Sequence, residues 1–205
     1  MLLYVDSEFL SPYAMTVFVA LREKALLFQI QPLDLAAGAA RSGDFAATSL
    51  TRRVPTLVDD AFTLSESSAI AEYLDEAYPG TRLYPPGLQA RARARQVQAW
   101  LRSDLMALRQ ERSTDVVFRA PVDKPLSDAG RAAADKLVAA ASALLAHGGP
   151  HLFDNWSIAD VDLALMLNRL VRNGDTVPQP LADYAHRQWL RPSVQEWVMQ
   201  PRPAR

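Results

Sequence analysis

The hydrophobic positions change their spacing repeatedly over the first 80 residues, which predicts short strands alternating with helices. The predicted strands are short apolar runs at 2–5, 26–33, 54–58 and 62–64. The last two flank the turn Asp59-Asp60-Ala61, so they form a hairpin. Helical spacing appears at 12–24 and 65–77, whereas 41–51 is predicted to be irregular. The expected order is therefore β-α-β followed by β-β-α.

Beyond residue 87 the strand pattern disappears and the apolar positions follow helical spacing. The predicted helices cover 88–118, 130–147, 159–172, 181–188 and 193–200. The segment Tyr84-Pro85-Pro86-Gly87 has the composition of a linker. We therefore predict an α/β domain at 1–80, a linker at 81–87 and an all-helical domain at 88–205.

Composition and charge exclude several classes of function. The chain has 22 Lys and Arg against 23 Asp and Glu, so no nucleic acid or anionic membrane is expected as a partner. It has no Cys, which excludes disulfides, Cys-ligated zinc and an enzyme thiol nucleophile. The three His are scattered, so no metal site is expected. The N-terminus does not resemble a signal peptide and no apolar run could cross a bilayer, which predicts a soluble, cytoplasmic protein.

Two serine-containing helix starts have both a structural and a binding interpretation. Ser11-Pro12 is typical of a helix N-cap with proline in the first helical position, and such a Ser can also direct its hydroxyl at a thiolate. Around Glu66-Ser67 a strand gives way to a helix. The free N–H groups there attract anions and Glu66 attracts an ammonium, which suits an α-amino acid head. A simple cap by Ser65 or Ser67 is the alternative.

Val54-Pro55 opens the third predicted strand. A proline cannot donate to the strand ladder, so it belongs at an edge or a bulge. If the bond is cis, Val54 can offer its backbone N–H and C=O to an extended peptide. Taken alone, a proline that merely starts a strand is favoured.

Together these motifs resemble the cytosolic glutathione transferase family. The resemblance rests on Ser11-Pro12-Tyr13, Arg52-Arg53-Val54-Pro55 and Leu64–Ile70, and it extends to Trp156-Ser157-Ile158-Ala159-Asp160, which is similar to the family's N-capping box. The stretch Arg91–Met106 further resembles the bacterial YfcF-type branch.

The resemblance implies a thioredoxin-like N-terminal domain that binds glutathione as co-substrate without a metal. Val54 would pair with the cysteinyl unit beside a cis Pro55, and Glu66 and Ser67 would hold the γ-glutamyl head. Arg52 or Arg53 would pair with the glycyl carboxylate, because a guanidinium grips a carboxylate with two N–H bonds. Ser11 would stabilise the glutathione thiolate, with Tyr13 as runner-up.

The predicted long helix supplies further candidates. Asp104 falls on the apolar stripe of that helix, where an acid needs a partner. The resemblance suggests that it reaches the γ-glutamyl amine of a neighbouring subunit, and a structural partner such as Arg102 or a backbone N–H is the alternative. Arg109 and Arg112 recur on a face that is usually solvated, whereas the resemblance places this helix beside the pocket for a second substrate, where both would be candidates.

Three functions follow from the resemblance. The first is a glutathione transferase that attacks a small electrophile, with peroxidase activity as a variant, and that acts as a homodimer. The second is a zeta-like glutathione-dependent isomerase. The third is a non-catalytic binding protein, although the presence of Ser11, Val54, Glu66 and Ser67 counts against it.

Overall fold

The computed structural model describes residues 1–41 and 43–203, and these residues form two compact units. The first contains the chain up to Leu83 together with the C-terminal segment from Pro192, and the second runs from Tyr84 to Arg191. Because Ser42 and the last two residues are not described, the irregular segment predicted at 41–51 and the domain predicted at 88–205 each extend beyond the described residues.

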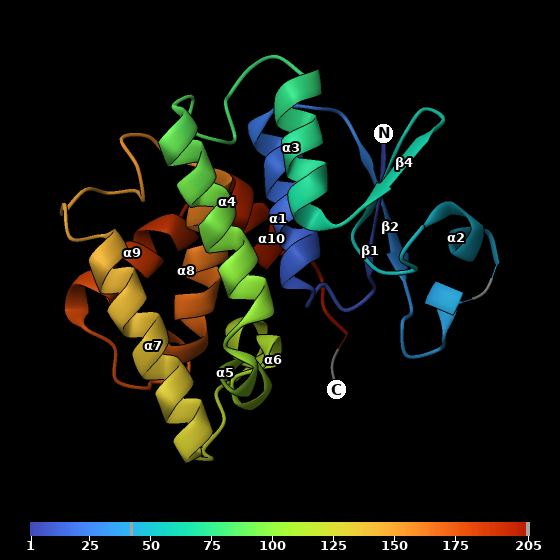
Figure 1. Cartoon of the computed structure of the whole chain (residues 1–205). Helices are drawn as coiled ribbons and strands as arrows, with labels where there is room; N and C mark the ends of the chain where they lie inside the picture. The colour runs from blue at the N-terminus through green and yellow to red at the C-terminus, as the bar shows by residue number, and fades with distance from the viewer. Residues whose placement is uncertain (42, 204–205) are drawn as a thin grey trace. The chain divides into compact units, whose positions relative to one another are not determined.

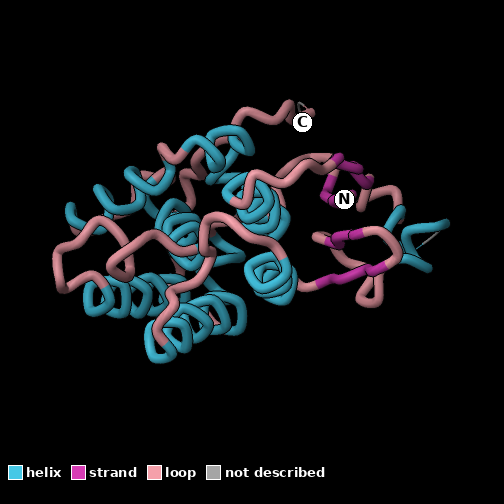
Figure 2. The backbone as a smooth tube through the Cα atoms, turned by 90° about the horizontal axis from the view of Figure 1, so that it is seen from above, coloured by secondary structure: helices cyan, strands magenta, loops and turns pink. Residues whose placement is uncertain are grey.

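The first unit is built on a mixed sheet. Within the described residues the sheet has four strands in the order β2-β1-β3-β4, with β1 parallel to β2 and antiparallel to β3. The strands are β1 (Leu2–Asp6), β2 (Gln29–Leu33), β3 (Thr56–Asp59) and β4 (Phe62–Ser65). The helical segments are α1 (Pro12–Glu23), η1 (Ala39–Arg41), α2 (Gly43–Thr48), α3 (Ser67–Ala77) and α10 (Pro192–Val198). Helices α1 and α3 lie side by side on one face and α2 lies on the other (Figures 1 and 2).

Helix α1 forms the centre of this unit because its sequence is apolar on every side. Its residues from Ala14 to Leu21 are all buried, and a helix that is hydrophobic all round packs in a core. The helix ends where Ala25 takes a positive φ of 53°, which turns the chain toward β2. This turn also shortens the predicted strand at 26–33, because Leu26 still donates its N–H to Leu21 and the first ladder residue is Gln29.

Helix α10 belongs to the first unit, although the sequence analysis assigned it to the helical domain. Trp197 is completely buried, and its ring lies 5.3 Å from that of Phe9 and 5.4 Å from that of Phe18. Arg22 adds an ion pair to Glu196 at 2.8 Å. The contacts of the Trp197 side chain therefore place α10 in the first unit. The domain boundaries 1–80, 81–87 and 88–205 remain predictions.

All the secondary-structure elements of the second unit are helices. Its helices are α4 (Leu88–Ser103), α5 (Met106–Glu111), α6 (Thr114–Phe118), α7 (Asp128–Leu144), α8 (Ile158–Val171) and α9 (Gln179–Trp189). Helix α8 is the central one, since every residue from Ile158 to Leu170 except Asp162 is buried. Helices α4, α6, α7 and α9 all contact it.

The single long helix predicted at 88–118 is wrong. The chain leaves the helix at Asp104, whose backbone is extended, and Leu105 adopts a left-handed conformation with a φ of 60°. The Asp104 carboxylate accepts hydrogen bonds from the N–H of Leu105 at 2.7 Å and from the indole N–H of Trp100 at 3.0 Å. It also pairs with Lys136 on α7. The bond from Leu105 replaces a helical bond of the backbone, and the bonds from Trp100 and Lys136 hold the carboxylate in place.

The predicted irregular segment at 41–51 is also partly wrong, because it contains helix α2 at Gly43–Thr48. Only Phe45 of this helix is buried, and its ring lies 5.0 Å from that of Tyr4. Such a short helix has little intrinsic stability. Packing against the sheet therefore decides that it forms.

The predicted capping box at the start of α8 is confirmed. Ser157 donates its backbone N–H to Asp160 Oδ2 at 2.8 Å, and the reciprocal bond to the Ser157 side chain is present. The same buried carboxylate accepts the N–H of Leu152 at 2.7 Å and the hydroxyl of Tyr184 at 2.8 Å. Burial raises the pKa of Asp160, although these donors favour its charged form. Asp160 thus joins α8, α9 and the preceding loop.

Replacing Asp160 should therefore weaken the whole helical unit. In Asp160→Ala, three donors from Leu152, Ser157 and Tyr184 lose a buried acceptor. We expect the free energy of unfolding to fall by about 3 kcal/mol, measured by urea denaturation. The control is Asp128→Ala, because the Asp128 side chain is 99% exposed and should change stability little. Equal losses in the two variants would contradict the role given to Asp160.

Candidate functional site

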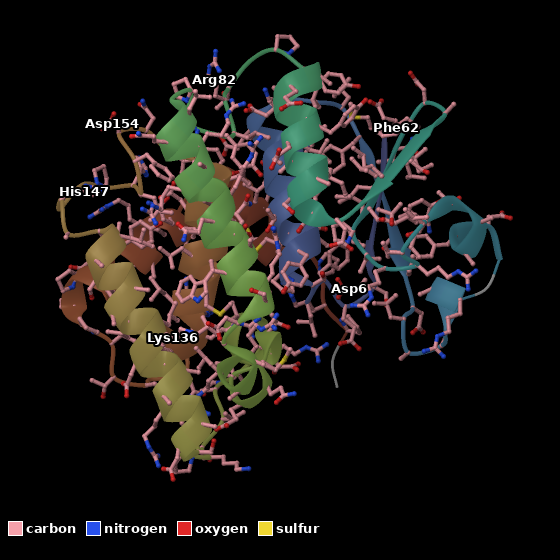
Figure 3. The ribbon with its side chains drawn as sticks, viewed as in Figure 1. Asp6, Phe62, Arg82, Lys136, His147 and Asp154 are labelled. Carbon is pink, nitrogen blue, oxygen red and sulfur yellow. The ribbon has the colours of Figure 1, made fainter. Side chains whose placement is uncertain are left out.

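Three segments of the first unit meet at one edge of its sheet. Tyr4 of β1 pairs with Thr56 of β3, and Thr56 pairs with Ser65 of β4. Because β3 is antiparallel to both neighbours, it begins beside the last residue of β4 and near the C-terminal end of β1. The loop into α1, the segment before β3 and the turn into α3 therefore lie together. Figure 3 labels Asp6 at this edge and Phe62 at the opposite one.

Ser11 is the N-cap of α1, as the sequence predicts. Its backbone is extended, Pro12 occupies the first turn, and its Oγ accepts the N–H of Ala14 at 3.2 Å. The side chain is half-buried. A hydroxyl that accepts one hydrogen bond still has its O–H to donate. Ser11 can therefore cap the helix and bond an anion at the same time. Tyr13, the runner-up, is half-buried in the first turn of the same helix.

A buried carboxylate that the sequence analysis missed holds the backbone in front of Ser11. Asp6 is 8% exposed and accepts the N–H of Leu10 at 2.7 Å and that of Ser11 at 3.0 Å. Phe9, the residue directly before Leu10, has a positive φ of 52°. An acid at the end of a buried strand, five residues before a helix N-cap, is the pattern that would have identified it. Asp6 fixes where the Ser11 hydroxyl lies.

Val54 and Pro55 are joined by a cis peptide bond, as the resemblance implies. The ladder of β3 begins only at Thr56, so the N–H and C=O of Val54 lie outside the sheet. The predicted strand at 54–58 therefore starts two residues too early. Pro55 is buried and Val54 is half-buried. This geometry leaves backbone groups of Val54 available to an extended ligand.

Glu66 and Ser67 begin α3 in an unusual way. Glu66 occupies the N-cap with a φ of 74° and ψ of 109°, and its side chain makes no capping bond. A non-glycine residue in such a conformation costs about 1–3 kcal/mol, and strain of this kind clusters at ligand sites. Neither Ser65, the last residue of β4, nor Ser67, the first of α3, provides the cap that the structural interpretation required. The exposed carboxylate of Glu66 thus lies beside uncapped N–H groups.

The two arginines before Val54 are both exposed. Arg52 has a positive φ of 52°, and the carbonyl of Arg53 accepts the hydroxyl of Thr56 at 2.8 Å. Thr56 is in turn bonded to Ser49 at 2.8 Å. The backbone of this turn is held firmly while both guanidinium groups face solvent. Both Arg52 and Arg53 are therefore candidates for binding a carboxylate.

The candidates in the second unit have different surroundings from those expected. Asp104 is not on a buried stripe, since its side chain is 36% exposed. Lys136, labelled in Figure 3, and the N–H groups of Leu105 and Trp100 lower the pKa of Asp104 to about 2. Arg102, the alternative partner, pairs instead with Asp162 at 3.3 Å.

Arg112 is buried rather than solvated. Arg112 is 2% exposed, and its guanidinium donates to both carboxylate oxygens of Asp175, at 2.6 and 2.8 Å. Asp175 raises the pKa of Arg112, so the pair stays charged. Arg109 is half-buried and has an Nη2 atom 3.6 Å from Met106 Sδ. The engagement of Arg112 counts against a role in binding a second substrate.

A cavity of about 640 Å³ lies in the second unit between α4 and α7. None of the candidate site residues lines it. Its walls include Val97 and Trp100, Lys136 and Ala140, and Leu152 and Phe153 from the loop before α8. Within residues 1–41 and 43–203, no group of three His, Cys, Asp or Glu is arranged to hold a metal ion. Over the same residues, no helix has both the length and the apolar character needed to span a bilayer.

The comparison with protein families identifies the fold. The model for the N-terminal domain of glutathione S-transferase matches residues 10–77, and the model for its C-terminal domain matches residues 87–201. The second match alone covers more than half of the chain. The chain belongs to the glutathione S-transferase family. The thioredoxin-like sheet unit and the helical unit are the two domains of this family, which confirms the predicted fold class.

Two solved structures are similar to this chain over all or nearly all of its length. A glutathione transferase homologue from Burkholderia, solved with bound glutathione, is 46% identical, with a TM-score of 0.79 over 97% of this chain and 96% of that chain. A maleylacetoacetate isomerase from Methylobacterium extorquens AM1, solved with malonate and glutathione, is 25% identical, with a TM-score of 0.77 over 100% of both chains.

A curated relative matches over a shorter region. Glutathione S-transferase theta-2 of Rattus norvegicus is 34% identical over 99 residues, which are 48% of this chain and 40% of that relative. The match therefore spans less than half the length of this curated relative.

The role of the Ser11 hydroxyl as a helix cap can be tested by measuring stability, independently of any role in binding an anion. Ser11→Ala removes the bond from Ala14 to Oγ and should lower the free energy of unfolding by about 1 kcal/mol. Ser11→Gly should lower it by only a few tenths of a kcal/mol, because glycine is tolerated at an N-cap. Urea denaturation measures both. A larger loss in the glycine variant would contradict the capping role.

Proposed function

We propose that this protein is a glutathione transferase in which Ser11 stabilises the thiolate of bound glutathione. The observation that carries the proposal is the convergence of Ser11, Val54 and the Glu66-Ser67 turn at one sheet edge. The bound glutathione in the 46% identical Burkholderia homologue supports the same ligand.

The residues at this edge fit the three parts of an extended tripeptide. The backbone of Val54 lies outside the ladder and suits the cysteinyl unit. Glu66 and the uncapped start of α3 offer a negative charge and free N–H groups, which suit the γ-glutamyl ammonium and carboxylate. The exposed guanidinium of Arg52 or Arg53 suits the glycyl carboxylate.

The chemistry assigned to the chain is modest, because the nucleophile belongs to glutathione. The Ser11 O–H would donate to the sulfur, and the N-terminus of α1 adds a positive partial charge. Both lower the thiol pKa, and each unit corresponds to about 1.4 kcal/mol. The thiol proton passes to solvent, the sulfur bonds to the electrophilic carbon, and a leaving group such as halide departs with the electron pair of its bond.

We also propose a branch of the family and a type of active site for this chain. The motif Arg91–Met106 supports the YfcF-type branch, and Ser11 supports a serine-type active site. Glutathione peroxidase activity, a homodimer and a cytoplasmic location remain predictions. A role of Arg109 in binding a second substrate is also a prediction. For Asp104 to bind the γ-glutamyl amine of a neighbouring subunit, its carboxylate would have to share or exchange its ion pair with Lys136.

A glutathione-dependent isomerase is the second candidate. The maleylacetoacetate isomerase from Methylobacterium extorquens AM1 supports it, since that protein aligns with this chain over the full length of both. The presence of Ser11, Val54, Glu66 and Ser67 counts against a non-catalytic binding protein. Assays of aryl halide conjugation and of cis–trans isomerisation of a maleyl compound separate the two enzymes.

Removal of the Ser11 hydroxyl should impair thiol activation without impairing binding. In Ser11→Ala and Ser11→Gly we expect kcat/KM for aryl halide conjugation to fall by about 100-fold, as for the loss of one donor to a developing anion. The dissociation constant of glutathione, measured calorimetrically, should change little. Unchanged turnover in both variants would remove Ser11 from the mechanism, and tight binding with no turnover of any substrate in the wild type would favour a binding module.

Removal of the Glu66 charge should impair binding itself. Glu66→Gln keeps the shape of the side chain but loses its attraction for the γ-glutamyl ammonium, so the dissociation constant should rise by about 10-fold or more. Glu76→Gln is the matched control, because Glu76 is an exposed carboxylate near the other end of α3. If both variants bind glutathione equally well, the γ-glutamyl head does not lie at Glu66.

A further inference from the structure

The C-terminal segment of the chain contacts the loop that leads to Ser11. Helix α10 runs antiparallel along α1: Ser193 at its start bonds to Glu23 at the end of α1, and Trp197 near its end packs against Phe18 and Phe9. The chain then continues for a few residues to Arg202, which lies at the Ser11 end of α1.

Arg202 bridges two pieces of backbone. Its Nη1 donates to the carbonyls of Val198 at 2.6 Å and Gln200 at 3.1 Å, and its Nη2 donates to that of Trp197 at 3.1 Å. These bonds satisfy carbonyls at the C-terminal end of α10, where a cation is favourable. The Nη2 atom also donates to the carbonyl of Phe9 at 3.2 Å. That fourth bond is not needed to cap α10.

Phe9 is the residue of the loop 7–10 that most needs outside support. Its φ of 52° is uncommon for a bulky residue, so its conformation persists only where the surroundings hold it. Phe9 is 7% exposed, its ring packs edge-on against that of Trp197, and its carbonyl accepts the bond from Arg202. The opposite side of the loop is held by Asp6, which accepts the N–H groups of Leu10 and Ser11.

We propose that Arg202, together with Trp197, is a positioning residue for Ser11: the C-terminal segment holds Phe9 in its left-handed conformation, and thereby aims the Ser11 hydroxyl at the glutathione sulfur. This inference rests on the proposed function. It gives the last part of the chain a role in thiol activation, although Arg202 itself touches neither sulfur nor electrophile.

Two readouts test the inference in Arg202→Ala. The first is amide hydrogen exchange of residues 7–11 without glutathione, which should become faster because Phe9 loses its outside hydrogen bond. The second is the pKa of the bound glutathione thiol, followed by the ultraviolet absorbance of the thiolate, which should rise. We expect kcat to fall by about 10-fold at a pH below that pKa with KM for glutathione unchanged, since small misplacements of a catalytic group are costly.

Matched variants separate positioning from general loosening. Glu196→Gln removes the ion pair to Arg22 from the same helix, away from the loop, and should leave both readouts as in the wild type. Arg202→Lys keeps the charge but cannot bridge all the carbonyls, so an intermediate effect is expected. In a Ser11→Ala background, Arg202→Ala should cause no further rise of the thiol pKa, because the residue acts through Ser11.

Each result decides the question. Unchanged exchange at residues 7–11 in a folded Arg202→Ala or Arg202→Gln variant overturns the inference, whether or not glutathione binds. Faster exchange with an unchanged thiol pKa overturns the functional part of it. Full additivity with Ser11→Ala also overturns it. If the wild type itself does not lower the thiol pKa, the proposed function fails, and the exchange experiment still decides whether Arg202 holds the loop.

Discussion

The antiparallel placement of β3 between β1 and β4 is the constraint on which the candidate site depends. Because Thr56 pairs with Tyr4 on one side and with Ser65 on the other, three segments far apart in sequence share one edge. A register shift by one residue would reverse the faces of β3 and carry Val54 and Glu66 away from each other. The site is therefore a property of the sheet pairing, and the residues that occupy it only determine which ligand is bound.

The residues at this end of the sheet differ in how far they contribute to stability and to the proposed binding. In the proposed site Ser11 would serve both purposes, because its hydroxyl accepts the N–H of Ala14 and still has a proton to donate. In the proposed site Glu66 would serve binding rather than helix capping, since its φ is positive and its side chain makes no capping bond. Asp6 compensates by satisfying two N–H groups in a buried position. Such a mixture of strained and over-determined residues is typical of a site that is rigid before its ligand arrives.

The features that the sequence predicted well are those that depend on neighbouring residues. The N-cap at Ser11, the capping box at Ser157 and Asp160 and the hairpin at β3-β4 follow local rules. The failures involve distant partners. The break at Asp104 depends on Lys136, 32 residues away, and the place of α10 depends on Trp197 reaching Phe9. Asp6 was missed because its partners, the N–H groups of Leu10 and Ser11, are backbone groups, so only its place between a buried strand and a helix N-cap marks it in the sequence.

The return of α10 to the sheet unit has a consequence for synthesis of the chain. The core around Phe9 and Phe18 lacks Trp197 until residues 192–203 have left the ribosome, whereas the helical unit from Tyr84 to Arg191 is complete before then. The domain encoded first is thus finished last. A nascent chain halted after Arg191 would present an open apolar surface on α1, and premature termination there should yield a species recognised by chaperones as incompletely folded.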